Sequence, residues 1–415
     1  MSEEVIIARE TENVSGTVQI SGAKNSALKL IAATMLGQGK STLHNIPHIS
    51  DIEIMNDVIR SLGATVEWDG HSLIIDTEHA EGHDTPYELV SKMRASISVL
   101  GPLVGRFGCA RVAMPGGCKI GARKIDMHLK VLEAMGVEFE NSHGYLYAST
   151  PNGLHSADVL LEFPSVGATE NMLMTSVIDN AAREPEIVDL ANMLNAMGAH
   201  VEGAGTPTIT VKGVALSEMR PCEHTTVGDR IEAGTFLTAG ALLGGPVTVQ
   251  GIDPSYLRMA LMKLEHMGCD ISTTEDSITV SRTQPLRATD IQTLPHPGFP
   301  TDLQAQFMLL ASFAEGNSVI SENIFENRFM FASELNRMGS RIAVEGHHAL
   351  VQGVSKLEGA PVSSPDLRGG AALVIAGLAA EGETVVHDIY HIDRGYEDYV
   401  GKLHAIGANV ERKTL

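Results

Sequence analysis

The chain has 415 residues and carries 30 Lys and Arg against 51 Asp and Glu, which gives a formal net charge of −21. So acidic a protein repels nucleic acid and anionic membranes, and neither is expected as a partner. A hydrophobic content of 43% excludes global disorder, and there is no run of about 18 apolar residues that could span a bilayer. The acidic start at Met1–Glu4 is unlike a secretion signal, so we expect a cytoplasmic protein.

The cysteines and histidines point away from metal and disulfide chemistry. Cys109, Cys118, Cys222 and Cys269 lack paired or metal-ligand spacing, and the 17 histidines are scattered. The P-loop, the nucleophile elbow and the zinc-protease signature are all missing. We therefore expect free thiols in a reducing compartment, with no metal and no cofactor.

One phrase recurs six times along the chain: an amphipathic helix, then a glycine, then a short β-type run. The glycine falls where the end of a helix needs a left-handed residue. Successive copies are 62 to 73 residues apart, too far for the common solenoid repeats. The shared glycines are Gly63, Gly136, Gly198, Gly268, Gly339 and Gly407.

The sequence upstream of most copies completes a repeating unit. It contains a small-residue helix, a glycine turn and a strand, as in Ala239–Val249. The unit therefore reads strand, helix, strand, helix, two strands, and six units predict an α/β or α+β protein with three units per domain. The strands Val5–Ile7 and Thr17–Ile20 are left over, so the chain is expected to begin in one domain, build the other and return. Candidate crossings are Ser21–Ala23 and Thr225–Arg230.

Two loops in the first half carry residues suited to chemistry. In Ser21–Ser26 a small-residue turn opens a helix and includes Lys24, which suits an anion, although a helix cap with an exposed lysine explains it equally well. In Met114–Arg123 two glycines precede Cys118, and nearby cations lower the pKa of a thiol. Such a thiol can transfer a proton or attack an electrophile.

The second half offers a carboxylate and several arginines. Three prolines stiffen Pro295–Asp302, and either Thr301 or Asp302 could cap the helix expected from Leu303. Asp302 would also be a well-placed base, and one residue can do both. Asp366, Arg368 and Arg394 occupy matching turns of the last repeat, and Arg328 lies in the repeat before it. Taken singly, each arginine is more simply explained by a surface ion pair.

At these residues the chain resembles the enolpyruvyl transferases nearly end to end. The resemblance rests on the segments Ser21–Asn25, Met93–Ile97, Pro115–Arg123, Ser165–Asn171, Asp229–Glu232, His296–Asp302, Phe325–Phe329 and His391–Tyr396. It implies an α/β (α+β) protein of two similar domains, each an inside-out α/β barrel of three βαβαββ repeats with pseudo-threefold symmetry. The first domain would span residues 22–230 and the second residues 1–21 and 231–415, with the active site in the cleft between them.

The resemblance also implies a reaction and a role for each site residue. An enolpyruvyl group would pass from phosphoenolpyruvate to the 3′-hydroxyl of UDP-N-acetylglucosamine by addition and elimination, as the first committed step towards peptidoglycan. Cys118 would protonate the methylene carbon, and Asp302 would take the hydroxyl proton. The remaining roles implied are these: phosphoenolpyruvate bound by Lys24, Asn25, Arg123 and Arg394; the UDP-sugar by Arg94, Arg123, Lys124, Ile125, Asp126, Met127, Ser165, Val166, Gly167, Asp302 and Ile324; and a supporting set of Asp366, Arg368 and Arg328.

Two positions depart from the family pattern, and two other functions compete. Phe163 stands where the family often has a lysine near the nucleotide, and Ser98 replaces a common aromatic residue. The alternatives are a transferase that makes 5-enolpyruvylshikimate 3-phosphate and a non-catalytic UDP-sugar-binding paralogue. Because both expected substrates are anions, the basic residues should form a local pocket on an acidic protein that is a monomer or a weak oligomer.

Overall fold

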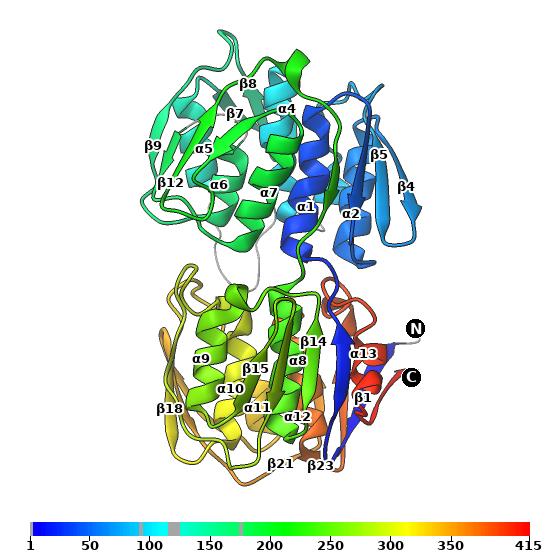
Figure 1. Ribbon diagram of the computed structural model, residues 1–415, viewed down its shortest axis with the longest axis vertical. Helices are drawn as coiled ribbons and strands as arrows, with labels where there is room; N and C mark the ends of the chain where they lie inside the picture. Colours follow the sequence, from blue (N-terminus) through cyan, green and yellow to red (C-terminus); the bar gives the residue numbers. More distant parts are fainter. Residues whose placement is uncertain (1–2, 91–93, 115–124, 174–176) are drawn as a thin grey trace. The chain divides into compact units, whose positions relative to one another are not determined.

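The computed structural model describes residues 3–90, 94–114, 125–173 and 177–415. The chain divides into two compact units, which are described separately (Figure 1). The described residues between Gly22 and Val227 form the middle domain. The terminal domain combines the residues up to Ser21 with those from Gly228 to Leu415.

The described part of the middle domain contains the predicted unit twice in full, and a third time with a single parallel bridge between Asp84 and Arg111 in place of the first strand. Its sheets have the strand orders β13-β3-β5-β4, β9-β10-β12-β11 and β6-β8-β7, so each ends in an antiparallel hairpin. In chain order the elements are α1 (Lys24–Ala33), β3 (Lys40–His44), α2 (Ser50–Ser61), β4 (Thr65–Asp69), β5 (Ser72–Asp76), α3 (Tyr87–Val90), η2 (Arg94–Val99), α4 (Leu100–Phe107), β6 (Cys109–Ala113), α5 (Asp126–Ala134), β7 (Glu138–Ser142), β8 (Tyr145–Ser149), β9 (Asp158–Leu160), α6 (Val166–Met172), β10 (Val177–Asp179), α7 (Pro185–Ala196), β11 (His200–Glu202), β12 (Thr208–Lys212) and β13 (Glu223–Thr225).

The terminal domain repeats the same plan. Its three four-stranded sheets have the orders β2-β14-β16-β15, β17-β18-β20-β19 and β22-β24-β1-β25, and β21 pairs with β23 in a separate two-stranded sheet. In chain order the elements are β1 (Glu4–Arg9), β2 (Gly16–Gln19), α8 (Arg230–Leu243), β14 (Val247–Gln250), η4 (Pro254–Leu257), α9 (Arg258–His266), β15 (Asp270–Thr273), β16 (Ser277–Ser281), β17 (Ile291–Gln292), η5 (Thr301–Leu303), α10 (Gln304–Phe313), β18 (Asn317–Ser321), α11 (Ala332–Arg337), β19 (Arg341–Glu345), β20 (His348–Gln352), β21 (Leu357–Glu358), β22 (Pro361–Ser363), α12 (Leu367–Leu378), β23 (Ala380–Glu381), β24 (Glu383–His387), α13 (Tyr399–Ala405) and β25 (Val410–Thr414).

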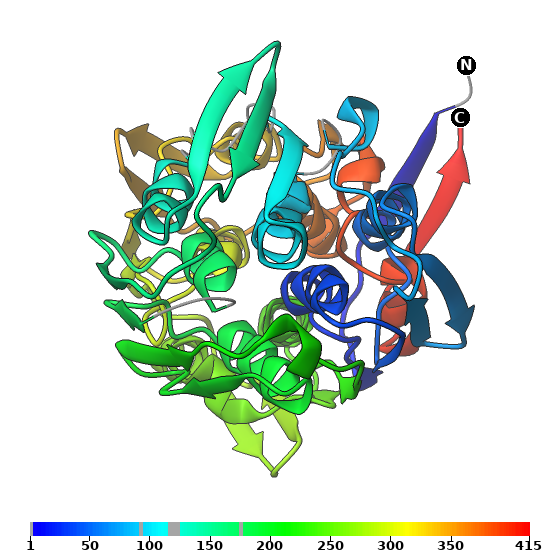
Figure 2. The ribbon, with the colours of Figure 1, turned by 90° about the horizontal axis from the view of Figure 1, so that it is seen from above.

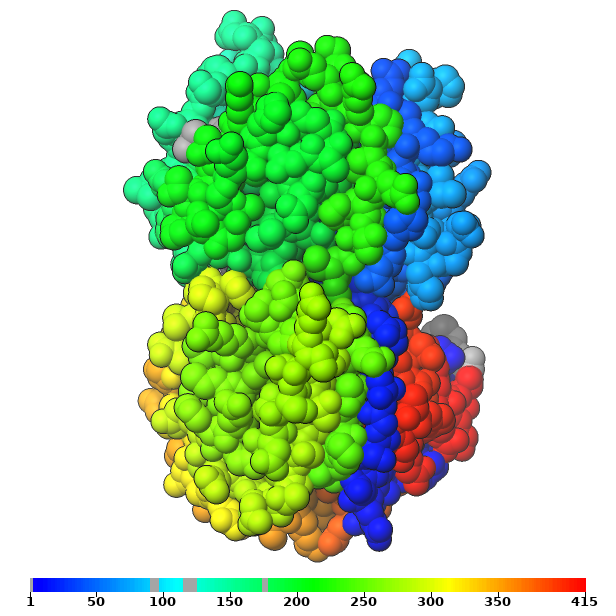
Figure 3. All heavy atoms as spheres, in the orientation of Figure 1, coloured from blue at the N-terminus to red at the C-terminus, as the bar shows by residue number. Residues whose placement is uncertain are grey.

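The two N-terminal strands complete repeats of the terminal domain. β2 runs parallel to β14, with Thr17 opposite Thr248. β1 lies between β24 and β25 and is antiparallel to both, with Ile7 opposite Val385 and Glu411. Figure 3 shows the blue N-terminal and red C-terminal segments side by side on this domain. The two strands that the repeat left over therefore belong to sheets whose other strands come much later in the chain.

Helices form the core of each domain, and the sheets lie outside them. In the terminal domain α8, α10 and α12 contact one another, and α12 is buried from Arg368 to Leu378. A helix that is apolar all round must be buried on every side. Figure 2 shows helices of the middle domain end-on, with the hairpins β4–β5 and β7–β8 at the rim. The α/β class and the repeating unit predicted from the sequence are confirmed.

The six repeat glycines have the backbone conformation predicted for them. Their φ angles lie between +86° and +108°, in the region that side chains of L-residues disfavour. Each follows directly on the end of a helix, as Gly268 follows α9 after Met267. The glycine thus ends the helix and turns the chain into the outer hairpin.

The cysteines that the structure describes are free thiols: Cys109, Cys222 and Cys269. Burial raises the pKa of both Cys222 and Cys269 to about 11, so these two are protonated and unreactive near neutral pH. Within the described ranges, every helix is too short or too polar to cross a bilayer.

Candidate functional site

Asp302 is held by two arginines in the terminal domain. It lies in the middle of η5, and its Oδ1 accepts a hydrogen bond of 2.7 Å from Arg328 Nη2. Its Oδ2 lies 3.6 Å from Arg368 Nη2. Both arginine side chains are 4% exposed, whereas that of Asp302 is 25% exposed. The arrangement therefore holds one accessible carboxylate in place with two buried guanidinium groups.

A buried polar cluster surrounds Arg368. Its guanidinium lies over the Tyr396 ring, 5.2 Å from the ring centroid, and the Tyr396 hydroxyl is 2.8 Å from Thr235 Oγ1. Gln306 Nε2 donates to Thr235 Oγ1 at 3.2 Å. Burial alone would lower the pKa of Arg368, but Tyr396 and Asp302 outweigh it and raise that pKa above its ordinary value. Arg368 is thus a permanent buried cation that faces Asp302.

These contacts decide between the alternative readings of the prolines and arginines. The N-cap residue of α10 is Leu303, which offers no side-chain cap, so Asp302 does not occupy the N-cap position of that helix. Arg328 and Arg368 are buried, so surface ion pairs do not explain them. Asp366 is itself a helix cap, because its Oδ1 accepts from the backbone N–H groups of Arg368 and Gly369 at the start of α12.

Two further residues of the predicted set lie on loops of the same domain. Ile324 follows β18 and is half-buried, with its backbone N–H bound to the Glu322 carboxylate at 2.9 Å. Arg394 follows the short turn after β24 and is also half-buried. Of the predicted residues in this domain, Arg328 and Arg368 contact Asp302 directly. Ile324 and Arg394 lie on other loops of the same domain.

Lys24 opens α1 in the middle domain and is buried. Its Nζ lies 2.6 Å from Asp51 Oδ2, in the first turn of α2, and the two side chains are 10% and 2% exposed. The alternative of an exposed lysine beside a helix cap is therefore wrong. Asn25 follows it and is half-buried, and its carbonyl accepts a 3.0 Å hydrogen bond from Lys29 Nζ.

The predicted UDP-sugar residues of this domain gather at the starts of α5 and α6. Ser165 caps α6 by accepting from the Ala168 N–H at 3.3 Å. Val166 and Gly167 begin that helix, and a Cβ on Gly167 would lie only 2.8 Å from the ring of His128 in α5. The glycine therefore permits the close approach of the two helices. At the start of α5, Ile125 and Met127 pack against the core and Asp126 is exposed.

Several predicted residues lie outside the described part of the chain. Cys118, Arg123 and Lys124 belong to residues 115–124, and for Arg94 only the backbone, at the start of η2, is described. Of the two departures from the family pattern, Phe163 is 40% exposed and Ser98 is 7% exposed. Phe163 thus presents an apolar ring to solvent three residues before α6 begins.

Two residues that support the site went unnoticed in the sequence. Asp51 looks like an ordinary acidic residue in the first turn of a helix, where it favours the helix dipole. His128 lies in the middle of an amphipathic helix, but its Nδ1 is 2.7 Å from Asn171 Nδ2, and Asn171 Oδ1 accepts from the Gly101 N–H at 3.1 Å. In the sequence, only the motif Ser165–Asn171, which contains the partner of His128, points towards either residue.

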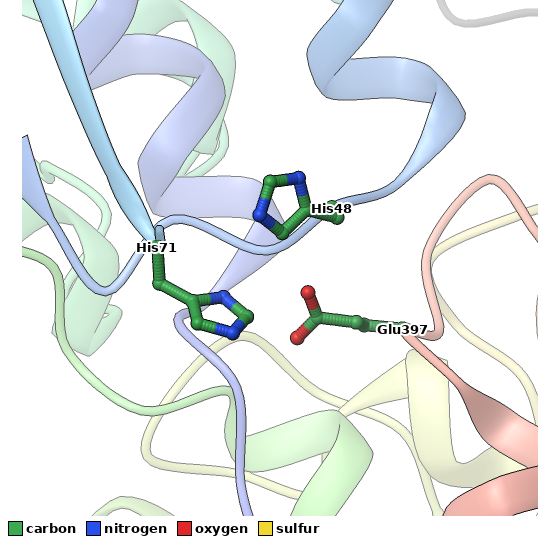
Figure 4. Close-up of side chains that lie close together, drawn as sticks. All are labelled: His48, His71 and Glu397. Carbon is green, nitrogen blue, oxygen red and sulfur yellow. The ribbon is translucent and has the colours of Figure 1, made fainter. Parts of the chain in front are cut away.

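His48 and His71 of the middle domain also lie close together (Figure 4). Their ring centroids are 5.0 Å apart, and the His48 ring is 4.0 Å from that of Trp68. His48 Nε2 is 2.9 Å from the Gly70 carbonyl oxygen. Both histidines are exposed, and these are contacts of an aromatic cluster on the surface of the middle domain.

A buried carboxylate of α6, that of Glu170, makes the stability of this domain depend on pH. Glu170 Oε1 lies 3.0 Å from Lys29 Nζ, and the two side chains are 4% and 14% exposed. Burial raises the pKa of Glu170 to about 7, with Lys29 opposing the rise and Glu186 and Glu184 adding to it. Between pH 4.5 and 7 the folded protein therefore holds a proton that the unfolded chain has lost, and stability falls as pH rises through that window.

We expect Glu170→Gln to flatten this fall, because glutamine does not titrate. A shift of this size corresponds to about 3 kcal/mol across the window. Urea unfolding midpoints measured at intervals from pH 5 to 8 would reveal it. Glu162→Gln is the control, because the exposed Glu162 bonds Lys130 and its pKa is lowered. Identical pH profiles for Glu170→Gln and the unmodified protein would contradict the expectation; some decline remains, since burial also raises the pKa of Glu232 to about 7.

Comparison with known proteins places the chain in a class. A family model described as EPSP synthase (3-phosphoshikimate 1-carboxyvinyltransferase) matches residues 8–403. The crystal structure of the enolpyruvyl transferase NikO from Streptomyces tendae is similar over 100% of both chains, with a TM-score of 0.90 and 26% identity. An EPSP synthase from Acinetobacter baumannii shares the fold, with a TM-score of 0.73 and 16% identity over 99% of this chain and 100% of that one. Fold and family model thus define an enolpyruvyl transferase.

Two curated relatives identify the branch of that class. UDP-N-acetylglucosamine 1-carboxyvinyltransferase 1 of Caldanaerobacter subterraneus subsp. tengcongensis is 48% identical over 414 residues, which cover 98% of this chain and 99% of the relative. UDP-N-acetylglucosamine 1-carboxyvinyltransferase of Mycolicibacterium paratuberculosis is 49% identical over 406 residues, 96% of this chain and 97% of the relative. The chain belongs to the UDP-N-acetylglucosamine 1-carboxyvinyltransferase family, and the resemblance found in its motifs is confirmed.

Proposed function

We propose that this protein transfers the enolpyruvyl group of phosphoenolpyruvate to the 3′-hydroxyl of UDP-N-acetylglucosamine and releases phosphate, as the first committed step of peptidoglycan synthesis. The observation that carries the proposal is the identity of 48–49% to carboxyvinyltransferases over nearly the whole chain. The contact of Asp302 with Arg328 and Arg368 supports it, because it provides an accessible base on a fixed cationic support.

The reaction consists of an addition and an elimination. Cys118 donates a proton to the methylene carbon of phosphoenolpyruvate, which leaves an oxocarbenium-like centre at the neighbouring carbon. The sugar hydroxyl attacks that centre while its proton passes to Asp302. The tetrahedral intermediate then returns a proton from its new methyl group to the Cys118 thiolate and breaks the bond to phosphate, which restores both the double bond and the thiol. Asp366 assists this proton traffic.

Binding is divided between the domains. Lys24, Asn25, Arg123 and Arg394 take the phosphate and carboxylate of phosphoenolpyruvate, since cations and amide groups suit both anions. The UDP-sugar is bound by Arg94, by residues 123–127, by the Ser165–Gly167 turn at the start of α6, and by Asp302 and Ile324. A helix N-terminus attracts anions, which supports the diphosphate as the partner of that turn. The proposal requires residues of both domains to reach the same substrates.

The nearest alternative acceptor is shikimate 3-phosphate. The 16% identity to an EPSP synthase of the same fold, against 48% to the carboxyvinyltransferases, favours the nucleotide sugar. A non-catalytic paralogue is disfavoured because Lys24, Cys118, Arg123, Asp302 and Arg394 are all present.

A steady-state assay tests the proposal directly. Phosphate release is measured with phosphoenolpyruvate and either UDP-N-acetylglucosamine or shikimate 3-phosphate as acceptor. We expect turnover with the nucleotide sugar alone, in the range of about 1–10³ s⁻¹ that is usual for enzymes. Turnover with shikimate 3-phosphate alone would mean that this compound, and not the nucleotide sugar, is the acceptor. Lack of turnover with either acceptor would favour the non-catalytic paralogue.

The cellular setting follows from the same proposal. The free thiols Cys109, Cys222 and Cys269 suit a reducing compartment, which supports the cytoplasm as the location. We propose a monomer or weak oligomer that acts on small molecules. Size-exclusion chromatography with light scattering at several protein concentrations would measure the oligomeric state.

A further inference from the structure

Glu322 is a fully buried carboxylate that lies directly after β18, with an exposed fraction of 0%. Burying a carboxylate is unfavourable unless hydrogen-bond donors replace the lost water. One oxygen, Oε1, accepts from the backbone N–H groups of Ile324 at 2.9 Å and Phe325 at 3.2 Å, and from the Thr293 hydroxyl at 3.0 Å. The other oxygen, Oε2, accepts from the Thr301 hydroxyl at 2.9 Å.

The two oxygens of Glu322 join the two segments that carry the Asp302 contact. Thr301 is the first residue of η5 and directly precedes Asp302. The turn bonded to Oε1 leads, a few residues on, to Arg328, whose Nη2 donates to Asp302 Oδ1 at 2.7 Å. A single buried side chain therefore ties the backbone beside the carboxylate to the loop that supplies its cation.

We infer that Glu322 is a positioning residue for the transfer reaction, and that through Thr301 it fixes Asp302 where it receives the proton of the sugar hydroxyl. The inference rests on the proposed function, in which Asp302 is the base. Because Glu322 is fully buried, we assign it an effect on the reaction only through the segment that bears Asp302.

The Thr301 hydroxyl carries this effect because it is the contact that links Oε2 of Glu322 to η5. The segment before it contains Pro295, Pro297 and Pro300, which lack the N–H groups that would anchor it to neighbouring strands. Without the hydroxyl, the backbone at Asp302 loses a charge-assisted hydrogen bond. Displacement of a reacting group by about 1 Å can reduce a rate by about 10²-fold.

The test compares Thr301→Val, which keeps the shape but removes the hydroxyl, with Thr301→Ser, which keeps the hydroxyl. Thr238→Val is the matched control, since Thr238 is buried in α8 of the same domain and donates to the Gly234 carbonyl at 2.9 Å. For each variant, kcat, the KM for phosphoenolpyruvate and the melting temperature are measured. A merely structural role would lower the melting temperature of both valine variants and leave their kcat alike.

We expect Thr301→Val to lower kcat about 10- to 100-fold with a KM for phosphoenolpyruvate within about twofold of the original. Thr301→Ser and Thr238→Val should keep kcat within about twofold. Glu322→Gln should retain more activity than Glu322→Ala, because its oxygen still accepts from the two N–H groups and its amide can donate to the Thr301 hydroxyl.

The outcomes separate this inference from the proposed function. An active unmodified enzyme whose Thr301→Val and Thr238→Val variants have equal kcat values overturns the positioning role alone. An unmodified enzyme without turnover on UDP-N-acetylglucosamine overturns the proposed function, and the inference falls with it.

Discussion

Replacement of Asp302 by asparagine is expected to lower kcat by about 10²- to 10⁴-fold, the usual contribution of a general base. The amide keeps the size of the side chain, and its oxygen can still accept the 2.7 Å hydrogen bond from Arg328. It cannot take a proton from the sugar hydroxyl. Steady-state phosphate release gives kcat, and calorimetric titration with UDP-N-acetylglucosamine should show a Kd within about threefold of the original.

The control for this substitution is Asp253→Asn. Asp253 is an exposed residue of the same domain that caps η4 by accepting from the Ser255 N–H at 2.8 Å. Asparagine is an equally good cap, so this variant should keep both stability and turnover. If Asp302→Asn retained more than about a tenth of the original kcat, another group would have to accept the proton.

Local signals in the sequence were sufficient for the repeat. Each of the six glycines follows the end of an amphipathic helix and has a left-handed backbone conformation. This conformation depends only on the few residues around the helix end, so it can be predicted from a short stretch of sequence. The unit of strand, helix, strand, helix and hairpin could therefore be predicted from contiguous stretches. The same reasoning left over β1 and β2, because pairing β1 with β24 and β25 joins residues almost four hundred positions apart.

The burial of the charged site residues could not be predicted in the same way. Arg328 and Arg368 are of a residue type that is mostly exposed, and a surface ion pair was the simpler expectation for each. Their burial depends on Asp302 and Tyr396, which come from other turns of the fold. The motifs indicated which residues matter, whereas the physical reason for their arrangement appears only when distant segments meet.

Replacement of Lys24, which forms a buried ion pair with Asp51, is expected to reduce both substrate binding and stability. Lys24→Met removes the cation proposed for phosphoenolpyruvate and leaves Asp51 buried without its 2.6 Å partner. Loss of a hydrogen bond to a charged group costs about 1.5–3 kcal/mol, so kcat/KM for phosphoenolpyruvate should fall roughly 10- to 100-fold. Because the buried Asp51 carboxylate loses its cation, the free energy of unfolding should fall by about 3–5 kcal/mol.

The double variant Lys24→Met, Asp51→Asn separates binding from stability. Neutralising the carboxylate removes the buried negative charge that has lost its cation, so most of the lost stability should return, as measured by urea unfolding. The value of kcat/KM should stay low, because the cation that binds the substrate is still missing. Lys130→Met is the control for losing a lysine, since Lys130 is 64% exposed and its ion-pair partner Glu162 is exposed as well. Recovery of kcat/KM together with stability in the double variant would mean that Lys24 acts through the fold of the middle domain, with the phosphate of the substrate bound by other cations.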